Sequence, residues 1–262
     1  MFERVTLGTV LGAILATAVG IVPVEPAQAQ RYQDRQYRAY GWTGFYFGGI
    51  IGARYTDAKW VTSRLADINN PNGPLLAASQ PDSDQLDSRS FNGALHAGYN
   101  WHAGSWVWGI EGDVGFARSS KTISGFPGTA PTTTPTDKLT AEAGHDGSVR
   151  LRAGVLLSPN TLWYATGGLA FQDATLTAAC PTLLGWCTVR HNESVDKVLL
   201  GYTIGGGVET AITRNWLARL EYRYSEFGKF DHTFFTGVPA DRLVGTGRFD
   251  SHKLGMGLSY KY

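Results

Sequence analysis

The stretch HKLGMGLSYKY, residues 252–262, alternates apolar side chains with small or polar ones up to the last residue of the sequence. Successive side chains of a β-strand point to opposite faces, so this stretch predicts a strand with one oily face. That face carries Leu254, Met256, Leu258, Tyr260 and Tyr262. An alternating, aromatic-rich strand on an exported chain is typical of a transmembrane β-barrel, because lipid-facing and lumen-facing residues alternate there.

The N-terminal residues have the order of an export signal. An apolar run from Val5 to Val22 follows Arg4, and the small-residue site Ala27-Gln28-Ala29 comes after the run. This order predicts a secretory signal peptide, although the run is long enough for a retained anchor helix to be the alternative. The predicted division is a cleaved signal peptide at residues 1–29, a periplasmic tail at 30–41 and an outer-membrane barrel domain at 42–262.

The composition excludes two other classes of protein. Beyond the N-terminal run, no segment approaches the roughly 20 uninterrupted apolar residues of a transmembrane helix. Charged residues make up 17% of the chain, and the formal net charge is only +1. A nucleic-acid-binding protein would favour a concentrated basic patch, so no nucleic-acid partner is expected.

Seven further segments show the same alternation, which gives eight, the smallest strand number of bacterial barrels. The eight segments are about Trp42–Tyr55, Arg89–His102, Trp106–Phe116, Ser148–Val155, Leu162–Ala174, Val198–Ile212, Trp216–Tyr224 and His252–Tyr262. Short connections alternate with long ones, the long ones being about Thr56–Ser88, Ser119–His145, Leu176–Asp196 and Lys229–Gly247. The pattern predicts an all-β, eight-stranded, antiparallel up-and-down transmembrane β-barrel with short periplasmic turns and four long extracellular loops. A soluble β-sandwich would have polar outward faces and no such alternation of connections.

Two motifs resemble those of a known family. The segments Gly41–Gly49 (GWTGFYFGG) and Leu162–Ala170 (LWYATGGLA) resemble the opening and the middle of small alphaproteobacterial outer-membrane β-barrel proteins, often described as porin-like surface proteins. The resemblance implies a barrel similar to the membrane domain of OmpA-type proteins and to opacity proteins. It also implies a location in the cell outer membrane, with membrane lipids and lipopolysaccharide as partners. Tyr262 would then resemble the signal read by the outer-membrane assembly machinery.

The lumen of an eight-stranded barrel is only wide enough for its own side chains. Nine charged residues are predicted to point into it: Glu111, Asp113, Arg150, Arg152, Glu209, Arg219, Glu221, Arg223 and Lys253. Unpaired, each buried charge would cost several kcal/mol, so these residues are expected to pair and to plug the lumen. A narrow ion-conducting path is the alternative, because inward glycines leave space for water.

Aromatic residues gather near the ends of the predicted strands. They are Trp42, Tyr55, Trp101, Trp106, Trp163, Trp216, Tyr222 and Tyr260. Trp and Tyr favour the membrane interface because each has an apolar body and a polar tip, so the set predicts an interfacial girdle. Stacking against a sugar is the alternative role.

The only two cysteines, Cys180 and Cys187, fall in the third long connection. Two cysteines close together in an exported loop predict a disulfide. Free thiols are one alternative, and a metal site is another, although His191 alone supplies too few additional ligands. No metal and no cofactor are therefore predicted.

Catalytic motifs are missing from the sequence, which contains no HExxH, no GxSxG and no P-loop. His102 and His145 are the histidines that a lipid A acyltransferase-like role would use, but His102 is expected at a periplasmic turn. We therefore expect no enzyme. The predicted function is a structural, surface-exposed barrel that contributes to envelope integrity and surface presentation.

Two alternative functions stay open: a narrow porin for small ions or solutes, and a loop-based adhesin or ligand-binding surface protein. The tail is expected to be a disordered periplasmic linker. Its arginines, Arg31, Arg35 and Arg38, suggest as an alternative a contact with anionic envelope material such as peptidoglycan, and the loops suggest contact with a host surface. The sequence names neither a ligand nor an oligomeric state.

Overall fold

The computed structural model describes residues 40–65, 83–128, 136–181 and 187–262. The predicted signal peptide and the predicted tail up to residue 39 lie outside the described residues. Tyr40, which the sequence assigned to the tail, belongs to the compact unit Tyr40–Tyr262. Among the described residues, no helix is both long and apolar enough to span a membrane.

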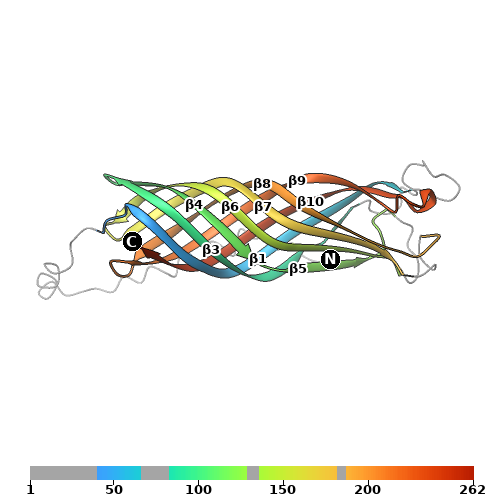
Figure 1. Cartoon of the computed structure of the whole chain (residues 1–262), viewed down its shortest axis with the longest axis horizontal. Helices are drawn as coiled ribbons and strands as arrows, with labels where there is room; N and C mark the ends of the chain where they lie inside the picture. The colour runs from blue at the N-terminus through green and yellow to red at the C-terminus, as the bar shows by residue number, and fades with distance from the viewer. Residues whose placement is uncertain (1–39, 66–82, 129–135, 182–186) are drawn as a thin grey trace, which may run out of the picture. The chain divides into compact units, whose positions relative to one another are not determined.

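The unit is built from antiparallel strands (Figure 1). Their bounds are β1 Gly44–Leu65, β2 Ser83–Gln85, β3 Ser88–Ala103, β4 Trp106–Phe116, β5 Ser119–Ser124, β6 Lys138–Ser158, β7 Thr161–Cys180, β8 His191–Ala211, β9 Trp216–Phe234 and β10 Leu243–Lys261, with a 3₁₀ turn η1 at Pro239–Asp241. Pairing runs in the order β1, β3, β4, β6, β7, β8, β9, β10 and back to β1, so the eight long strands form a closed ring. The predicted barrel is therefore confirmed. The short strands β2 and β5 extend the courses of β3 and β4.

The strands are longer than the sequence analysis predicted. A membrane crossing needs about 9–11 residues, whereas β7 has 20 residues and β6 has 21. β1 continues to Leu65, ten residues past its predicted end at Tyr55. The predicted bounds of the four long connections were therefore wrong, because much of each connection is a continuation of its flanking strands.

Two seams divide the continued strands into two sheets. Among the described residues, the ladder between β3 and β4 ends at the pair Gly93–Phe116, and β5 beyond it pairs only with β6. The ladder between β8 and β9 ends at the pair Gly201–Phe227. Beyond these pairs, one sheet runs β2-β1-β10-β9 and the other runs β5-β6-β7-β8. Figure 1 shows the strands parting into two layers at the end far from the C-terminus.

We call the closed ring the barrel part and the two-layered continuation the sandwich part. An apolar core fills the space between the two layers of the sandwich part. The sheet that contains β1 supplies mainly aromatic side chains to this core, including Trp60, Phe234 and Phe249. The facing sheet supplies small and aliphatic ones, including Ala141 and Leu176. Large side chains thus face small ones, and each fully buried Leu or Phe contributes roughly 1.5–3 kcal/mol.

The two parts expose opposite kinds of side chain. In the barrel part the outward face is apolar, as the alternation predicted: Leu151 is 69% exposed and Leu200 is 74% exposed. In the sandwich part the outward positions carry polar residues, among them Lys59, Thr175 and Asp231. The barrel part is therefore suited to lipid, and the sandwich part to water.

Five of the eight aromatic residues of the predicted girdle, four tryptophans and Tyr260, lie on the outer face at the turn end of the barrel. Tyr55 and Tyr222 lie further along β1 and β9, and Trp42 needs a correction. Trp101, Trp106, Trp163 and Trp216 are each about half exposed on the outer face. Trp42 was wrongly included, because it is fully buried and its indole N–H donates to the Pro159 carbonyl at 3.2 Å. It has the inward facing of Gly44 and Tyr46, two and four residues further along. Trp42 and five other apolar residues form the turn-end plug: Tyr40, Val107, Leu162, Tyr164 and Leu217.

Candidate functional site in the barrel lumen

The structure places all nine predicted charged residues inside the barrel, each less than 7% exposed. Strand alternation brings them there, and the ladder brings opposite charges together on neighbouring strands. Glu111 of β4 pairs in register with Arg150 of β6, and Glu209 of β8 pairs with Arg219 of β9. Directly opposed positions lie about 4.5–5.5 Å apart between Cβ atoms, which is within reach of an ion pair.

Glu111 is the centre of the largest group of contacts. Its Oε2 lies 2.7 Å from Nη1 of Arg219 and 3.5 Å from Nη1 of Arg152. Its Oε1 binds Nη2 of Arg150. The Tyr46 hydroxyl donates a further hydrogen bond to Oε2 at 2.8 Å. One carboxylate thus receives three guanidinium groups and a phenol.

Glu209 joins two of the same arginines from the other side. Its Oε2 lies 2.7 Å from Nη2 of Arg219 and 3.3 Å from Nη2 of Arg152. Arg152 also donates to the Tyr46 hydroxyl at 2.8 Å. Charge-assisted hydrogen bonds of this kind are stronger than neutral ones, so the contacts hold four strands in one register.

The network continues toward the sandwich part through Asp113 and Glu221. Nη1 of Arg223 lies 2.6 Å from Asp113, and Nη2 of Arg150 lies 3.2 Å from the same carboxylate. Nη1 of Arg150 is 2.9 Å from Glu221, which also accepts a hydrogen bond from the Tyr164 hydroxyl at 2.7 Å. Arg150 therefore links Glu111, Asp113 and Glu221 into one network.

Lys253 belongs to a second group that the sequence analysis missed. Its Nζ binds Asp146, whose other oxygen lies 3.5 Å from Nη1 of Arg54. Arg54 also donates to the Gln172 side chain. Alternation could have found both residues: Arg54 faces the way that Gly52 faces, and Asp146 faces the way that the predicted Arg150 faces. Together the two groups hold six cations and five carboxylates (Arg54, Arg150, Arg152, Arg219, Arg223 and Lys253; Glu111, Asp113, Asp146, Glu209 and Glu221).

The inward glycines accommodate neighbouring side chains. A Cβ atom on Gly98 would lie 2.5 Å from the Tyr46 hydroxyl, and one on Gly207 would lie 2.8 Å from the Tyr164 hydroxyl. At these positions the space beside the glycine is therefore filled by a tyrosine of the network. The glycines that favoured a water-filled path are, at these two places, part of the packing.

The structure does not bring the two considered histidines together. Nε2 of His102 lies 2.8 Å from the Gly104 carbonyl oxygen in a turn, while Nδ1 of His145 lies 3.8 Å from Asp173, with both of those side chains more than half exposed. The buried His96 binds the Ser259 hydroxyl at 2.8 Å. That contact pairs a hydroxyl with an imidazole, but both residues are buried in the lumen, each less than 4% exposed.

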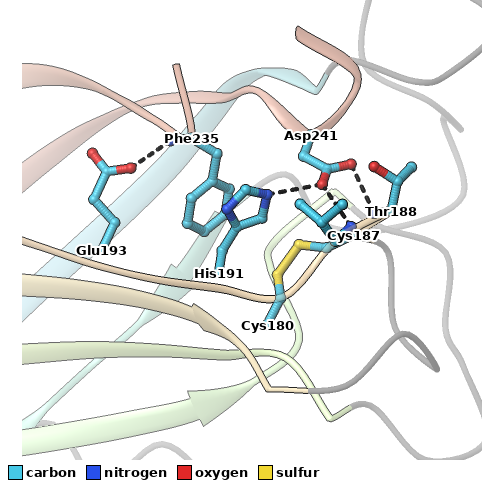
Figure 2. Close-up of a disulfide and its surroundings, with 8 residues drawn as sticks. Cys180, Cys187, Thr188, His191, Glu193, Phe235 and Asp241 are labelled. Carbon is cyan, nitrogen blue, oxygen red and sulfur yellow. Dashed lines mark hydrogen bonds and ion pairs between the residues drawn. A yellow bond between two sulfur atoms is a disulfide. The ribbon is translucent and has the colours of Figure 1, made fainter. Parts of the chain in front are cut away.

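Cys180 and Cys187 are joined by a disulfide at the outer end of the sandwich part (Figure 2). Asp137 lies within reach of both sulfur atoms, and these three residues form the one ligand cluster found among the described residues. Disulfide sulfurs are not thiolate ligands, so this cluster offers a metal a single carboxylate.

A closed ring of antiparallel strands with an apolar outer face, a charged interior and an aromatic girdle defines an outer-membrane β-barrel protein. Residues 14–262 match the family described as outer membrane protein beta-barrel domain, and the chain belongs to that family. Its place is the cell outer membrane.

Relatives include a 22 kDa outer membrane protein of Rhizobium leguminosarum bv. viciae, 29% identical over 75% of this chain and 69% of the relative. A 31 kDa outer-membrane immunogenic protein of Brucella melitensis is 28% identical over 96% of this chain and 97% of the relative. Among solved structures, the outer membrane protease OmpT of Escherichia coli covers 87% of this chain and 99% of its own, with a TM-score of 0.50 and 7% identity. At that identity, the likeness to OmpT concerns the fold alone.

Proposed function

We propose that this chain is a closed structural barrel that strengthens the outer membrane and displays its sandwich part at the cell surface. The observation that carries the proposal is the filling of the lumen by paired charges, with Glu111 and Arg150 at the centre. The turn-end plug lies on one side of this network and the sandwich core on the other. An ion crossing the barrel would have to separate buried ion pairs, each of which is costly to break.

Surface display is supported by the sandwich part and by the relatives. The long strands carry polar residues outward for many residues past the apolar band, where a purely transmembrane barrel would need only turns and loops. Several relatives bear the name outer-membrane immunogenic protein, which describes recognition of those proteins by a host. We therefore propose that the outward faces of the sandwich part carry any contact with a host surface. We propose no enzymatic activity.

The remaining proposed partners are membrane lipids, lipopolysaccharide, peptidoglycan and the outer-membrane assembly machinery. Membrane lipids and lipopolysaccharide would surround the apolar band, and peptidoglycan would be a partner of the N-terminal arginines. Tyr262 is 72% exposed on the lipid side, and its backbone N–H donates to the Phe45 carbonyl at 3.0 Å. This position leaves its side chain accessible, in support of the proposed role as a signal for the assembly machinery.

Single-channel conductance of the refolded protein in a planar bilayer tests the closed lumen. Silence is expected from protein shown to be folded by its heat-shifted gel mobility. The variant with Arg219→Gln and Arg223→Gln removes cations from the network, and Arg248→Gln removes an outward one from the sandwich part as a control. Steady wild-type openings that change only in the lumen variant would make the protein a narrow porin and overturn the proposal.

A further inference from the structure

The seam between β8 and β9 is closed by side chains where the ladder has ended. Beyond Gly201–Phe227, the two strands share no backbone pairing among the described residues. They belong to different sheets of the sandwich part, so something else must hold the sheets together at this edge. The contacts that do so lie near the disulfide, at the outer end of the seam (Figure 2).

Asp241 is the central residue of these contacts. It lies in η1, in the connection from β9 to β10, and its side chain is completely buried. Its carboxylate accepts hydrogen bonds from the backbone N–H groups of Thr188 and Val189, at 2.8 and 3.2 Å. Nε2 of His191 lies 2.9 Å from Oδ2 and completes the set. All three donors come from the other sheet, in and just before β8.

A second pair of contacts crosses the same seam. Glu193 of β8 accepts a hydrogen bond from the Phe235 backbone N–H at 2.7 Å. The Phe235 ring stacks on His191 with 4.4 Å between ring centroids and 15° between planes. Phe235 has a φ of 61°, a left-handed conformation that is unfavourable for a bulky residue. Its backbone is therefore held in place by these contacts rather than by its own preference.

The disulfide fixes the donors that Asp241 needs. Thr188 and Val189 directly follow Cys187, and Cys180 is the last residue of β7. With the disulfide intact, the two N–H groups are tied to the end of β7. With the disulfide reduced, the ladder pair Cys180–His191 would still join β7 to β8, but Cys187 and the two amides that follow it would lose their tether, and the buried carboxylate of Asp241 would lose donors. A buried carboxylate without partners is strongly unfavourable, so the loss would drive the β9–β10 connection outward.

We propose that the Cys180–Cys187 disulfide and Asp241 form a redox-dependent latch across the β8–β9 seam. A dithiol reductant would attack one sulfur, form a mixed disulfide and then close to its own cyclic disulfide. Two electrons and two protons pass to the protein, which gains two thiols. Reduction thus opens the outer end of the sandwich part while the barrel part, which shares no residue with the latch, stays closed.

Thermodynamic linkage supplies the test. If the Asp241 contacts form only with the disulfide intact, they stabilise the oxidised state, and removing them must make reduction easier by the same factor. The variant Asp241→Asn keeps the side-chain shape but replaces the carboxylate that the N–H groups need. Asp231→Asn is the matched control, because Asp231 is an exposed β9 carboxylate that accepts a hydrogen bond from Thr246 of β10 and takes no part in the contacts of Asp241.

The folded wild type and both variants are equilibrated in buffers of reduced and oxidised dithiothreitol, and free thiols are trapped with a polyethylene-glycol maleimide and counted by gel shift. Asp241→Asn is expected to be half-reduced at a reduced-to-oxidised ratio at least about tenfold lower than the wild type, since hydrogen bonds to a charged group are strong. Asp231→Asn should match the wild type. Equal midpoints for Asp241→Asn and the wild type would overturn the latch.

A second variant keeps the test decisive if Asp241→Asn fails to fold. The double substitution Cys180→Ser and Cys187→Ser removes the disulfide with little change in size. Hydrogen exchange should then accelerate at Thr188, Val189 and Phe235 by at least about tenfold, because their acceptors no longer hold them. Exchange in the barrel part should stay unchanged. Unchanged protection of these three amides would show that the disulfide does not control the seam, and would overturn the proposal.

Discussion

The barrel part and the sandwich part are made of the same strands but bury opposite kinds of side chain. Within the barrel part, β6 points Arg150 and Arg152 inward and Leu151 outward. Within the sandwich part, the same strand points Leu139 inward and Thr140 outward. A bulge between Ala143 and Asp146 shifts the alternation by one residue, so odd-numbered residues point inward in the sandwich part and even-numbered ones in the barrel part. The chemistry of the two faces is exchanged across this bulge. The surrounding medium decides which arrangement is stable, because lipid accepts apolar faces and water accepts polar ones.

The shape of the cross-section changes together with the chemistry. A closed ring leaves no unpaired strand edge in lipid, where each unpaired backbone group would cost several kcal/mol. In water those groups can bind solvent, so the ring can open at two seams and flatten into layers. Flattening brings the two inner faces close enough to pack Phe249 and Trp60 against the alanines of the facing sheet. The barrel part therefore has a charged lumen because lipid surrounds it, and the sandwich part has an apolar core because water surrounds it.

The largest expected effect is that removing a carboxylate destabilises the barrel part far more than the sandwich part. Glu111→Ala would leave Arg150, Arg152 and Arg219 with one carboxylate fewer in a buried site, lowering the free energy of unfolding by about 3–5 kcal/mol. Glu142→Ala in the sandwich part should cost less than about 1 kcal/mol, because its carboxylate is exposed and accepts a long hydrogen bond from the Ser120 hydroxyl at 3.4 Å. Urea unfolding of the refolded protein in lipid vesicles, followed by tryptophan fluorescence, measures both. Equal losses would remove the distinction between the parts.

In the second prediction the sandwich part, and not the barrel part, loses more stability, because apolar contacts are removed. Leu176→Ala would leave a cavity in the sandwich core, where the side chain is 2% exposed, at a cost of about 2–5 kcal/mol. Leu151→Ala on the lipid face should cost much less, because lipid chains fill the space. Hydrogen exchange should accelerate in the sandwich residues of β6 and β7 only for Leu176→Ala. Exchange that accelerates equally along the whole strands would show that the two parts unfold as one unit.

The position of the membrane boundary sets the third prediction. Leu151→Arg places a charge on the lipid face and should lower the free energy of unfolding by about 2–4 kcal/mol. Thr175→Arg, outward on β7 in the sandwich part, should change the free energy of unfolding by no more than about 0.5 kcal/mol. Thr175 donates to the exposed Asp196 carboxylate at 2.6 Å, and an arginine at this position can pair with the same carboxylate. The same vesicle-based unfolding applies. A large loss for Thr175→Arg would place the lipid boundary beyond residue 175 and make the sandwich part membrane-embedded.

Much of the barrel part could be predicted from alternation alone, because each strand residue of a membrane barrel faces either the lipid or the lumen. The lumen positions of Glu111 and Arg219 and the outward face of Leu254–Tyr262 follow from period two. Tyr164 was missed because the adjacent Gly167-Gly168 pair has no side chains with which to fix the facing of its strand. Arg54 was missed because the inward set of its segment was read from the glycines alone.

The sandwich part was taken for loops, and the reason is physical. Apolar side chains outward and polar ones inward is the arrangement of a membrane barrel, and it holds only where lipid is outside. Beyond Tyr55 the pattern continues with Ala58 and Trp60 inward and Lys59 outward, so the strand persists while the expected polarity is reversed. The contacts of Asp241 with Thr188 and Val189 join residues more than 50 positions apart, so no local sequence pattern could predict them.

The smallest expected effect is confined to the latch and depends on pH. Burial would raise the pKa of Asp241, but the hydrogen bonds from Thr188, His191 and Val189 outweigh it and hold the pKa below its usual value. A group whose pKa is lower in the folded state stabilises it fully above its unfolded pKa, about 3.9 for Asp, and loses that contribution as the pH falls through the folded pKa.

The latch should therefore be insensitive to Asp241 between neutral pH and about pH 4, and should loosen only in stronger acid. Other titratable groups near the seam are Glu193, His232 and Arg242. NMR shifts of the Thr188 and Val189 amide protons report the carboxylate directly, and Asp241→Asn is the blank. An Asp241-dependent titration centred above pH 4 would contradict this account, because it would mean that the amides fail to stabilise the charged form.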